Sequence, residues 1–346
     1  MGKEQSMALR GIAITMMVMY HLFYVATAHG YEVVTYLNFG EVPLLERLSE
    51  IAYPVSLFVM ITGYGLAVAH QKRTMGRAAG NVNIGGGNSL GRKTWKLFFR
   101  LWMVYLLVIP IGYCAQPERY PGTWDTLIIN LLNIQTTYNV SEWFLLPYLL
   151  MVAVSPLLLK FIFRFNSFWA IALSLLATAI YLLIYQGHME ELRSYVGAFG
   201  AKMFLTLSFF LPFTLGTLAF KHSLPEYVRD KLGKIGTLAK PVAVLLLILL
   251  IVFRCFVHNQ SLQPFAVFVL FIMFPSLNLS RKSMQILCFL GKHSVVIWFI
   301  HTWFSQNLFA AQIYGLHYPI LIFAAVMALS VLTSLLIEFV CQRLRI

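Results

Sequence analysis

The sequence is poor in charge. Only 11% of its 346 residues are Asp, Glu, Lys or Arg, whereas 59% are hydrophobic. Soluble domains carry about 25% charged residues, so this composition argues against a soluble globular protein. The mean hydropathy of +0.75 and the aromatic content of 15% fit a chain built for a bilayer, because Trp and Tyr favour membrane interfaces. We therefore expect an integral membrane protein.

Cysteine is also scarce. The four cysteines lie far apart and form no CxxC pair or Cys/His cluster. This spacing gives no indication of a structural zinc site or a disulfide framework, and we expect no bound metal. The glycines of residues 76–93 fall in no GxGxxG or Walker pattern between a strand and a helix, so we interpret that stretch as a flexible linker.

Ten apolar runs of about the length that crosses a bilayer follow one another along the chain. They cover residues 9–29, 51–69, 97–115, 143–163, 168–186, 202–220, 238–257, 262–278, 293–312 and 318–340. Segment 122–134 is only moderately apolar, carries Asp125 and several amides, and is expected to form an interfacial helix. The sequence thus predicts a single all-α membrane domain over 1–346 with about ten transmembrane helices.

The net charge of +13 follows the loops. Of the 26 Lys and Arg residues, 21 fall at the two termini or in the even-numbered loops, and nine of the 13 acidic residues fall on the other side. Since basic loops remain in the cytoplasm, we expect both termini and the 76–93 stretch to be cytoplasmic. The basic excess then reflects topology, and we expect no nucleic acid among the partners.

The first apolar run contains two ionisable residues, Arg10 and His21. Their eleven-residue separation is three helical turns plus about 20°, so both project from one helix face. Arg10 lies at the predicted cytoplasmic boundary, where a basic side chain commonly reaches the headgroups. His21 lies past the predicted middle of the bilayer, where ionisable groups are costly and usually face a polar cavity. A structural histidine held by one interhelical hydrogen bond is the alternative.

Five stretches resemble, in order, the motifs of the acyltransferase 3 family of integral membrane O-acyltransferases. LRGIAITMMVMYH (9–21) is similar to the Arg–ten residues–His signature, and SLFVMITGYGLAVA (56–69) to the second-helix pattern, with Thr62 and Tyr64 where Ser and Phe are usual. The other three are KLFFRLWMVYLL (96–107), SEWFLLPYLLMVAVSPLL (141–158) and FLGKHSVVIWFIHTWF (289–304). Together they cover nearly the whole chain.

The resemblance implies transfer of an acyl group, often acetyl, from cytoplasmic acyl-CoA to a hydroxyl of a cell-surface carbohydrate or its lipid-linked precursor. Acyl transfer to a hydroxyl needs a base, and histidine is the usual side chain, so we predict that His21 is the catalytic base. Because guanidinium groups bind phosphate well, we predict donor binding by a basic set, for which positive-inside orientation is the alternative. The set is Arg10, Arg92, Lys93, Lys96 and Arg100.

A second set of residues is predicted to line the cavity or to contact the acceptor. It comprises Tyr20, Ser56, Tyr64, Glu142, Trp298 and His301. His301 is placed to approach His21 or to line the same cavity, with a packing histidine as the alternative. Glu142 is a candidate to orient His21 or to bind sugar hydroxyls, although an exposed loop acid is the more common explanation. The hydroxyl residues of the set also fit ordinary interhelical hydrogen bonding.

The resemblance also implies a setting: a multi-pass protein of the bacterial inner membrane, surrounded by lipid, with acyl-CoA as a substrate and no permanently bound cofactor. A transporter or flippase for a lipid-linked sugar is the main alternative, since ten spans with a buried Arg and His describe such proteins too. A membrane protein with a structural or sensing role is a third, and it would tolerate loss of His21.

Overall fold

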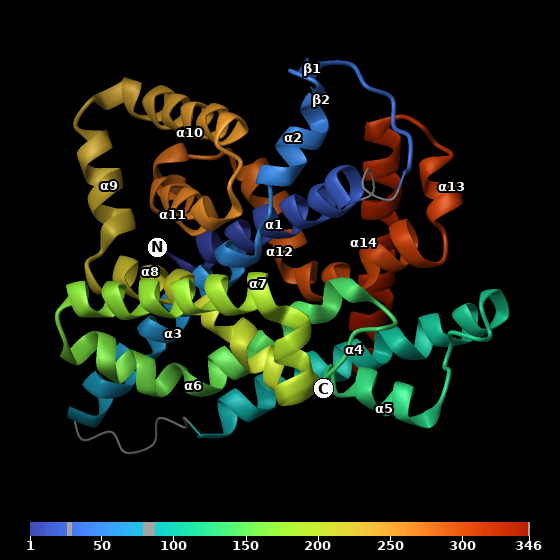
Figure 1. The fold of residues 1–346 in the computed structure, drawn as a ribbon. Coiled ribbons are helices and arrows are strands. Elements are labelled where there is room, and N and C mark those ends of the chain that lie inside the picture. The colour runs from blue at the N-terminus through green and yellow to red at the C-terminus, as the bar shows by residue number, and fades with distance from the viewer. Residues whose placement is uncertain (26–29, 79–86, 345–346) are drawn as a thin grey trace.

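A computed structural model describes residues 1–25, 30–78 and 87–344, and these residues are almost entirely helical (Figure 1). Their one sheet is a two-stranded antiparallel ribbon of β1 (Asn38–Phe39) and β2 (Val42–Pro43). The prediction of an all-α membrane protein is confirmed.

The helices follow one another with short connections. They are α1 (Lys3–Met19), α2 (Leu44–Ile51), α3 (Val55–Ala78), α4 (Gly87–Ala115), α5 (Trp124–Leu131), α6 (Leu145–Arg164), α7 (Ser167–Thr206), α8 (Phe210–Lys221), α9 (Leu224–Gly233), α10 (Ala239–Phe256), α11 (Gln263–Met273), α12 (Arg281–Thr302), α13 (Ala310–Tyr314) and α14 (Pro319–Arg343). Three further helical turns, each at or near a predicted site residue, are not α-helical. They are π-helical turns over Tyr20–Val25 and Trp303–Asn307 and a 3-10 turn over Val140–Phe144.

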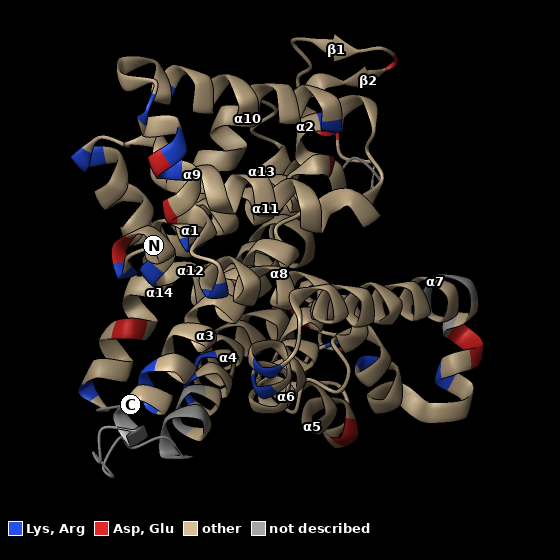
Figure 2. Cartoon of the chain, turned by 90° about the vertical axis from the view of Figure 1, so that its left-hand side faces the viewer, with Lys and Arg blue, Asp and Glu red and all other residues tan. Residues whose placement is uncertain are grey.

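Ten helical stretches among the described residues are long and apolar enough to cross a membrane, which confirms the predicted number. They cover Lys3–Val25, Leu44–Met75, Thr94–Ala115, Val140–Arg164, Ser167–Ile184, Glu190–Lys221, Gly236–Phe256, Gln260–Leu277, Arg281–Asn307 and Pro319–Arg343. Each overlaps one predicted run. Charged positions lie mainly toward the helix ends and in the connections (Figure 2), as expected where the helix middles meet hydrocarbon.

The predicted connection between the fifth and sixth runs is a bent helix rather than a loop. α7 extends over both the end of one run and the start of the next, and its backbone leaves the helical region at His188 and Gly197. Gly197 has a φ of +68°, a conformation that glycine adopts at no steric cost because it lacks a Cβ atom. The two runs are therefore joined by a kink.

The predicted linker over residues 76–93 is shorter than expected. α3 continues to Ala78 and α4 begins at Gly87, so both ends of the stretch are helical, and residues 79–86 lie outside the described part of the chain. Helices form at these ends because each propagates from a long apolar run. Segment 122–134 forms the short helix α5, which is not among the ten candidate spans.

Glycines bring α1 and α12 into backbone contact. A Cβ atom on Gly11 would lie 2.0 Å from the carbonyl oxygen of Leu287, and one on Gly291 would lie 2.0 Å from that of Met7. Small residues allow such close approach between membrane helices, where packing replaces the hydrophobic effect as the source of association. Gly63 repeats this contact between α3 and α8, with a Cβ 2.4 Å from a backbone oxygen. These two helix pairs form the centre of the molecule and position the site.

Candidate active site

His21 lies where α1 gives way to the π-helical turn Tyr20–Val25. Such turns are rare within helices and occur frequently at functional sites. Two side chains from the C-terminal part of the chain hold this turn. Gln306 donates from Nε2 to the carbonyl oxygen of His21 over 3.0 Å, and the Tyr314 hydroxyl donates to the carbonyl oxygen of Leu22 over 3.1 Å. The backbone at His21 is therefore fixed by distant segments.

The fold brings His21 and His301 into direct contact. Nε2 of His301 lies 3.0 Å from Nδ1 of His21, and the ring centroids are 4.9 Å apart. His301 occupies the last turn of α12, directly before the second π-helical turn. No group of three or more His, Cys, Asp or Glu side chains that could hold a metal occurs in the described part of the chain.

The two histidines differ in access. His301 is 0% exposed, whereas His21 retains 9% exposure. Tyr20 packs edge-on against His21, with ring centroids 5.3 Å apart, so this predicted residue adjoins the pair. Both residues are thus buried, and His21 is the one that keeps some exposed surface.

Glu142 requires a correction, because it is neither an exposed loop acid nor a partner of His21. It is 0% exposed and lies in the 3-10 turn before α6. Its Oε2 accepts a hydrogen bond from the Tyr105 hydroxyl over 2.5 Å, and Nδ2 of Asn139 lies 3.4 Å from Oε1. Burial removes the carboxylate from an incoming sugar and places it in a polar network inside the bundle.

That network clamps the last turns of α12. Asn139 accepts at Oδ1 from the Thr302 hydroxyl over 2.8 Å, and the indole of Trp298 donates to the carbonyl oxygen of Ser141 over 3.0 Å. Buried polar groups need such partners, and a fully bonded network is rigid. The network thus fixes the turn that carries His301. Sequence reasoning missed Asn139 and Thr302, although the polar run just before Trp143 was a usable signal.

A cavity of about 460 Å³ lies between α1, α3, α4, α6 and α12. Three of the five predicted donor-binding side chains line it, namely those of Arg10, Lys96 and Arg100. Arg92 and Lys93 are on α4, but their side chains lie outside the described part of the structure. One cavity therefore collects basic residues from two helices.

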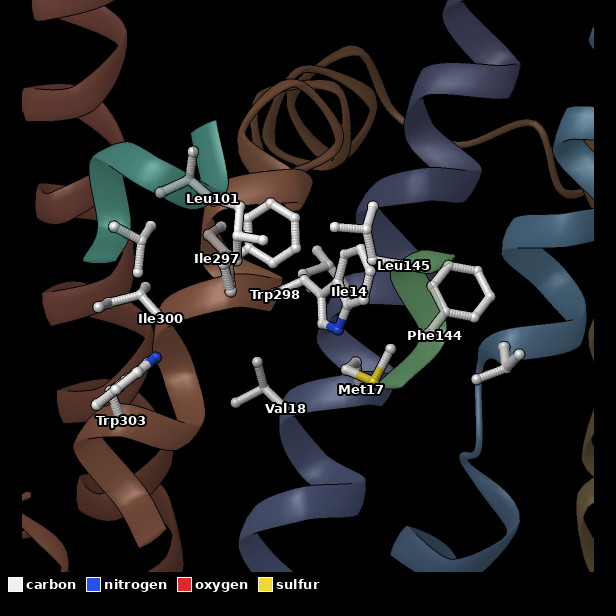
Figure 3. Packing of buried hydrophobic residues seen from close by; sticks show 14 of the residues in the cluster. Ile14, Met17, Val18, Leu101, Phe144, Leu145, Ile297, Trp298, Ile300 and Trp303 are labelled. Carbon is white, nitrogen blue, oxygen red and sulfur yellow. The ribbon is translucent and has the colours of Figure 1, made fainter. Parts of the chain in front are cut away.

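Four aromatic side chains line the same cavity. They belong to Phe58, Phe144, Tyr148 and Trp298. Trp298 and Phe144 pack edge-to-face with ring centroids 5.1 Å apart, and Figure 3 shows Trp298 close to Met17 of α1. Trp298 is one helical turn before His301 on α12, and neither His21 nor His301 is among the described residues that line the cavity.

Arg100 is held at the cavity by Glu338 of α14. Its Nε and Nη2 atoms each lie 2.8 Å from Oε1 of Glu338. Both side chains are partly exposed, so the pair remains accessible to a ligand.

Of the six residues predicted to line the cavity or to contact the acceptor, Trp298 alone is among the described residues that line this cavity. Tyr64 and Ser56 have other surroundings. The Tyr64 hydroxyl accepts a hydrogen bond from the amino group of Met1 over 2.9 Å, and the Tyr64 ring packs against Phe220 and Phe271. Ser56 is buried within α3. Neither is among the described residues that line the cavity, because the backbone contact between α3 and α8 turns these positions away from it.

The fold and the site together define a polytopic membrane protein with a polar site buried in its helix bundle. The model of the acyltransferase domain family matches residues 7–339, nearly the whole chain. The chain belongs to this family, and it is therefore a multi-pass membrane acyltransferase. Comparisons with curated proteins and with solved structures gave no match.

Proposed function

We propose that this protein transfers a short acyl group, acetyl first of all, from acyl-CoA to a hydroxyl of a cell-surface carbohydrate or its lipid-linked precursor, with His21 as the general base. One observation carries the proposal. A single cavity joins the basic side chains of Arg10 and Arg100 to Trp298, one turn before the histidine that contacts His21.

The basic side of the cavity suits the phosphates of coenzyme A. Arg10 comes from α1, and Lys96 and Arg100 come from α4, so a phosphate there meets cations from two directions. Hydrogen bonds between cations and phosphate are about twice as strong as neutral ones. Donor phosphate at Arg100 would share or replace the contact with Glu338. A volume of about 460 Å³ is within the range of small-molecule sites.

The aromatic side of the cavity supports a short acyl group. Phe58, Phe144 and Trp298 line the cavity, and Trp298 is one helical turn before His301. Flat, rigid rings leave room for an acetyl group more readily than for a long chain, because close-packed side chains yield little.

The reaction requires the protein to take up one proton and to release it again. As the acceptor hydroxyl oxygen attacks the thioester carbonyl carbon, His21 takes its proton, and a carbon–oxygen bond forms. The carbon–sulfur bond then breaks, and the departing thiolate takes the proton from His21, which regenerates the neutral base. General base catalysis of this kind contributes about 10² to 10⁴ in rate.

The same proposal places the protein in the inner membrane of a bacterial cell envelope. There, acyl-CoA reaches the basic helix ends from the cytoplasm, and the polysaccharide or its lipid-linked precursor is present in the same membrane. O-acetylation of the glycan is the expected product.

The test uses purified full-length protein, radiolabelled acetyl-CoA, and membranes of the expressing cells as the source of acceptor. We expect acceptor-dependent release of CoA and label in carbohydrate. His21→Gln should lower turnover by about 10² to 10⁴, because glutamine keeps a hydrogen-bonding amide but takes up no proton at neutral pH. The control is His258→Gln, at an exposed position after α10. Normal turnover in His21→Gln would remove the catalytic role, and sugar movement without acyl turnover would favour a transporter.

A further inference from the structure

We infer that His301 is a positioning residue that keeps a hydrogen on Nδ1 of His21, so that Nε2 of His21 is the atom that takes the proton of the acceptor hydroxyl. The inference rests on the proposed role of His21 and deepens it, since it assigns the reacting atom and gives the second histidine a function. It follows from the hydrogen-bond partners of the two rings, taken in sequence from α12 to α1.

The backbone around His301 determines which of its ring nitrogens carries the hydrogen. Its Nδ1 lies 2.9 Å from the carbonyl oxygen of Ile297 and 2.8 Å from that of Trp298. A carbonyl oxygen only accepts hydrogen bonds, so Nδ1 must carry the hydrogen. A neutral imidazole has one N–H, which leaves Nε2 of His301 with a lone pair.

The tautomer of His301 determines the tautomer of His21. Nε2 of His301, now an acceptor, lies 3.0 Å from Nδ1 of His21, so Nδ1 of His21 must be the donor. The carbonyl oxygen of Met17, another acceptor, lies 3.0 Å from the same Nδ1. Both neighbours therefore require the same tautomer, and the lone pair of neutral His21 is on Nε2.

The neighbouring carbonyl of Met17 does not make His301 redundant. It already accepts the backbone N–H of Tyr20 at the end of α1, so its lone pairs are shared between two donors. His301 offers Nε2 to His21 as a second acceptor, from a helix that the network around Asn139 holds in place. Contact from a rigid second helix also fixes the orientation of the His21 ring, which a bond within its own helix does less well.

The arrangement divides the work between the two histidines. His301 is fully buried, whereas the residue His21 keeps 9% exposure, so we assign contact with substrate to His21 and positioning to His301. When Nε2 takes up a proton, the cation keeps its Nδ1–H directed at two acceptors, which stabilises it. The side chain that accepts the hydrogen bond from Nδ1 of His21 is thus the neutral imidazole of His301 and not a carboxylate. The carboxylate of Glu142 is bonded to Tyr105 instead.

The tautomer is tested directly by long-range proton–nitrogen correlation spectra of full-length protein in detergent micelles, labelled at histidine nitrogen. The resonances of His21 are assigned by their loss in His21→Gln. We expect wild-type His21 and His301 both to carry the hydrogen on Nδ1. In His301→Phe, which keeps a ring but offers no acceptor, part of the His21 population should move its hydrogen to Nε2.

Turnover of radiolabelled acetyl-CoA in the membrane assay should follow the tautomer. His301→Phe should lower kcat by roughly 10- to 100-fold, less than the ~10⁴ that follows loss of a charged tautomer-holding partner. KM for acetyl-CoA should not change, since His301 is not among the described residues that line the cavity. His301→Gln should restore kcat to within a few-fold of wild type, because its amide oxygen falls near the position of Nε2.

The matched control is His293→Phe. His293 is also buried on α12, but its Nδ1 lies 2.9 Å from the Ser334 hydroxyl and not near His21, so kcat and the His21 spectrum should remain unchanged. A wild-type His21 with its hydrogen on Nε2 would overturn the inference, even if His301→Phe fails to fold. So would a His301→Phe variant in which the hydrogen stays on Nδ1, whether kcat falls or not. Full turnover in His21→Gln would overturn the proposed function instead, and the spectra would still decide the tautomer.

Discussion

The spans of α1 and α12 differ from those of α10 and of the first part of α7 in composition and in surroundings. The first two have a mean hydropathy of 1.4, and 50% and 44% of the residues in their most apolar windows are buried within the protein. The stretches Ser167–Ile184 and Gly236–Phe256 reach 2.1 and 2.5, yet only 11% of their windows is buried. The less apolar helices are thus the central ones.

The difference follows from what each helix touches. A span that faces lipid must present apolar side chains all round, because no partner there satisfies a polar group. A span enclosed by other helices meets protein, so it can carry the glycines of the α1–α12 contact and the histidine pair. Among these four spans, the two of lower hydropathy are therefore the ones that pack closely and carry the histidine pair.

The largest effect is expected from Gly291→Leu, which tests whether α1 and α12 are closely packed. A side chain at this position meets the carbonyl oxygen of Met7, which belongs to a helix backbone and cannot turn aside. We expect a cost above the roughly 1–3 kcal/mol that is typical of overpacking, seen as loss of the folded monodisperse protein in detergent. Gly233→Leu on α9, where a Cβ meets open space, is the control. Equal thermal transitions for the two variants would show that the central pair is not closely packed.

A milder comparison removes side chains at the centre and at the edge. Ile14 of α1 is 0% exposed, whereas Leu249 of α10 is 54% exposed. Ile14→Ala leaves a cavity among fixed neighbours and should lower the free energy of unfolding by about 2–5 kcal/mol. Leu249→Ala faces lipid and should change it by less than about 0.5 kcal/mol. Chemical denaturation in mixed micelles measures both. A similar loss at both positions would contradict the division into central and lipid-facing helices.

The next prediction concerns the basic end of the central cavity. Arg100→Ala should weaken acetyl-CoA binding by about 1.5–3 kcal/mol, the worth of a hydrogen bond to a charged group, which is roughly a 10- to 150-fold rise in Kd. Arg164→Ala removes an exposed arginine at the end of α6, outside the cavity lining, and should leave Kd unchanged. Equilibrium binding to folded protein decides. An unchanged Kd in Arg100→Ala would leave positive-inside orientation as the reason for this arginine.

The number of spans and the main ionisable residues were predictable from the sequence. Apolar length alone gave the number of spans, because a bilayer imposes its thickness on every helix. Arg10, His21 and His301 were also recognisable from the sequence. An ionisable group within an apolar run is costly to place in a membrane and needs a particular environment. The fold places Arg10 at the cavity and the two histidines in contact.

The buried polar network was not predictable in the same way. Glu142 sits at the end of an apolar run, where an acidic residue usually faces water, and its burial depends on the Tyr105 hydroxyl 37 residues away. Asn139 and Thr302 are 163 residues apart. Such pairs depend on how helices pack against one another, which the periodicity of one helix does not encode. The bend of α7 at Gly197 was missed because the mostly polar stretch 186–194 just before it usually indicates a loop.

The smallest effect is expected from two cysteine substitutions that test which side of the membrane the basic helix ends face. Gly91 is exposed at the start of α4, and a Cβ there meets no atom within 4 Å. Leu37, just before β1, is 66% exposed. Neither Gly91→Cys nor Leu37→Cys should alter stability by more than about 0.5 kcal/mol. The background carries Cys114→Ser, since Cys114 is itself exposed.

From outside intact cells, an impermeant maleimide should label Leu37→Cys at once and Gly91→Cys only after the membrane is permeabilised, because the basic loops are expected in the cytoplasm. Gly91 lies five residues before Lys96 on the same helix, so its side of the membrane is also the side from which a donor enters the cavity. Labelling of Gly91→Cys in intact cells would reverse the topology. It would also contradict a cytoplasmic donor, because acyl-CoA would then have to approach Arg10 and Arg100 from outside the cell.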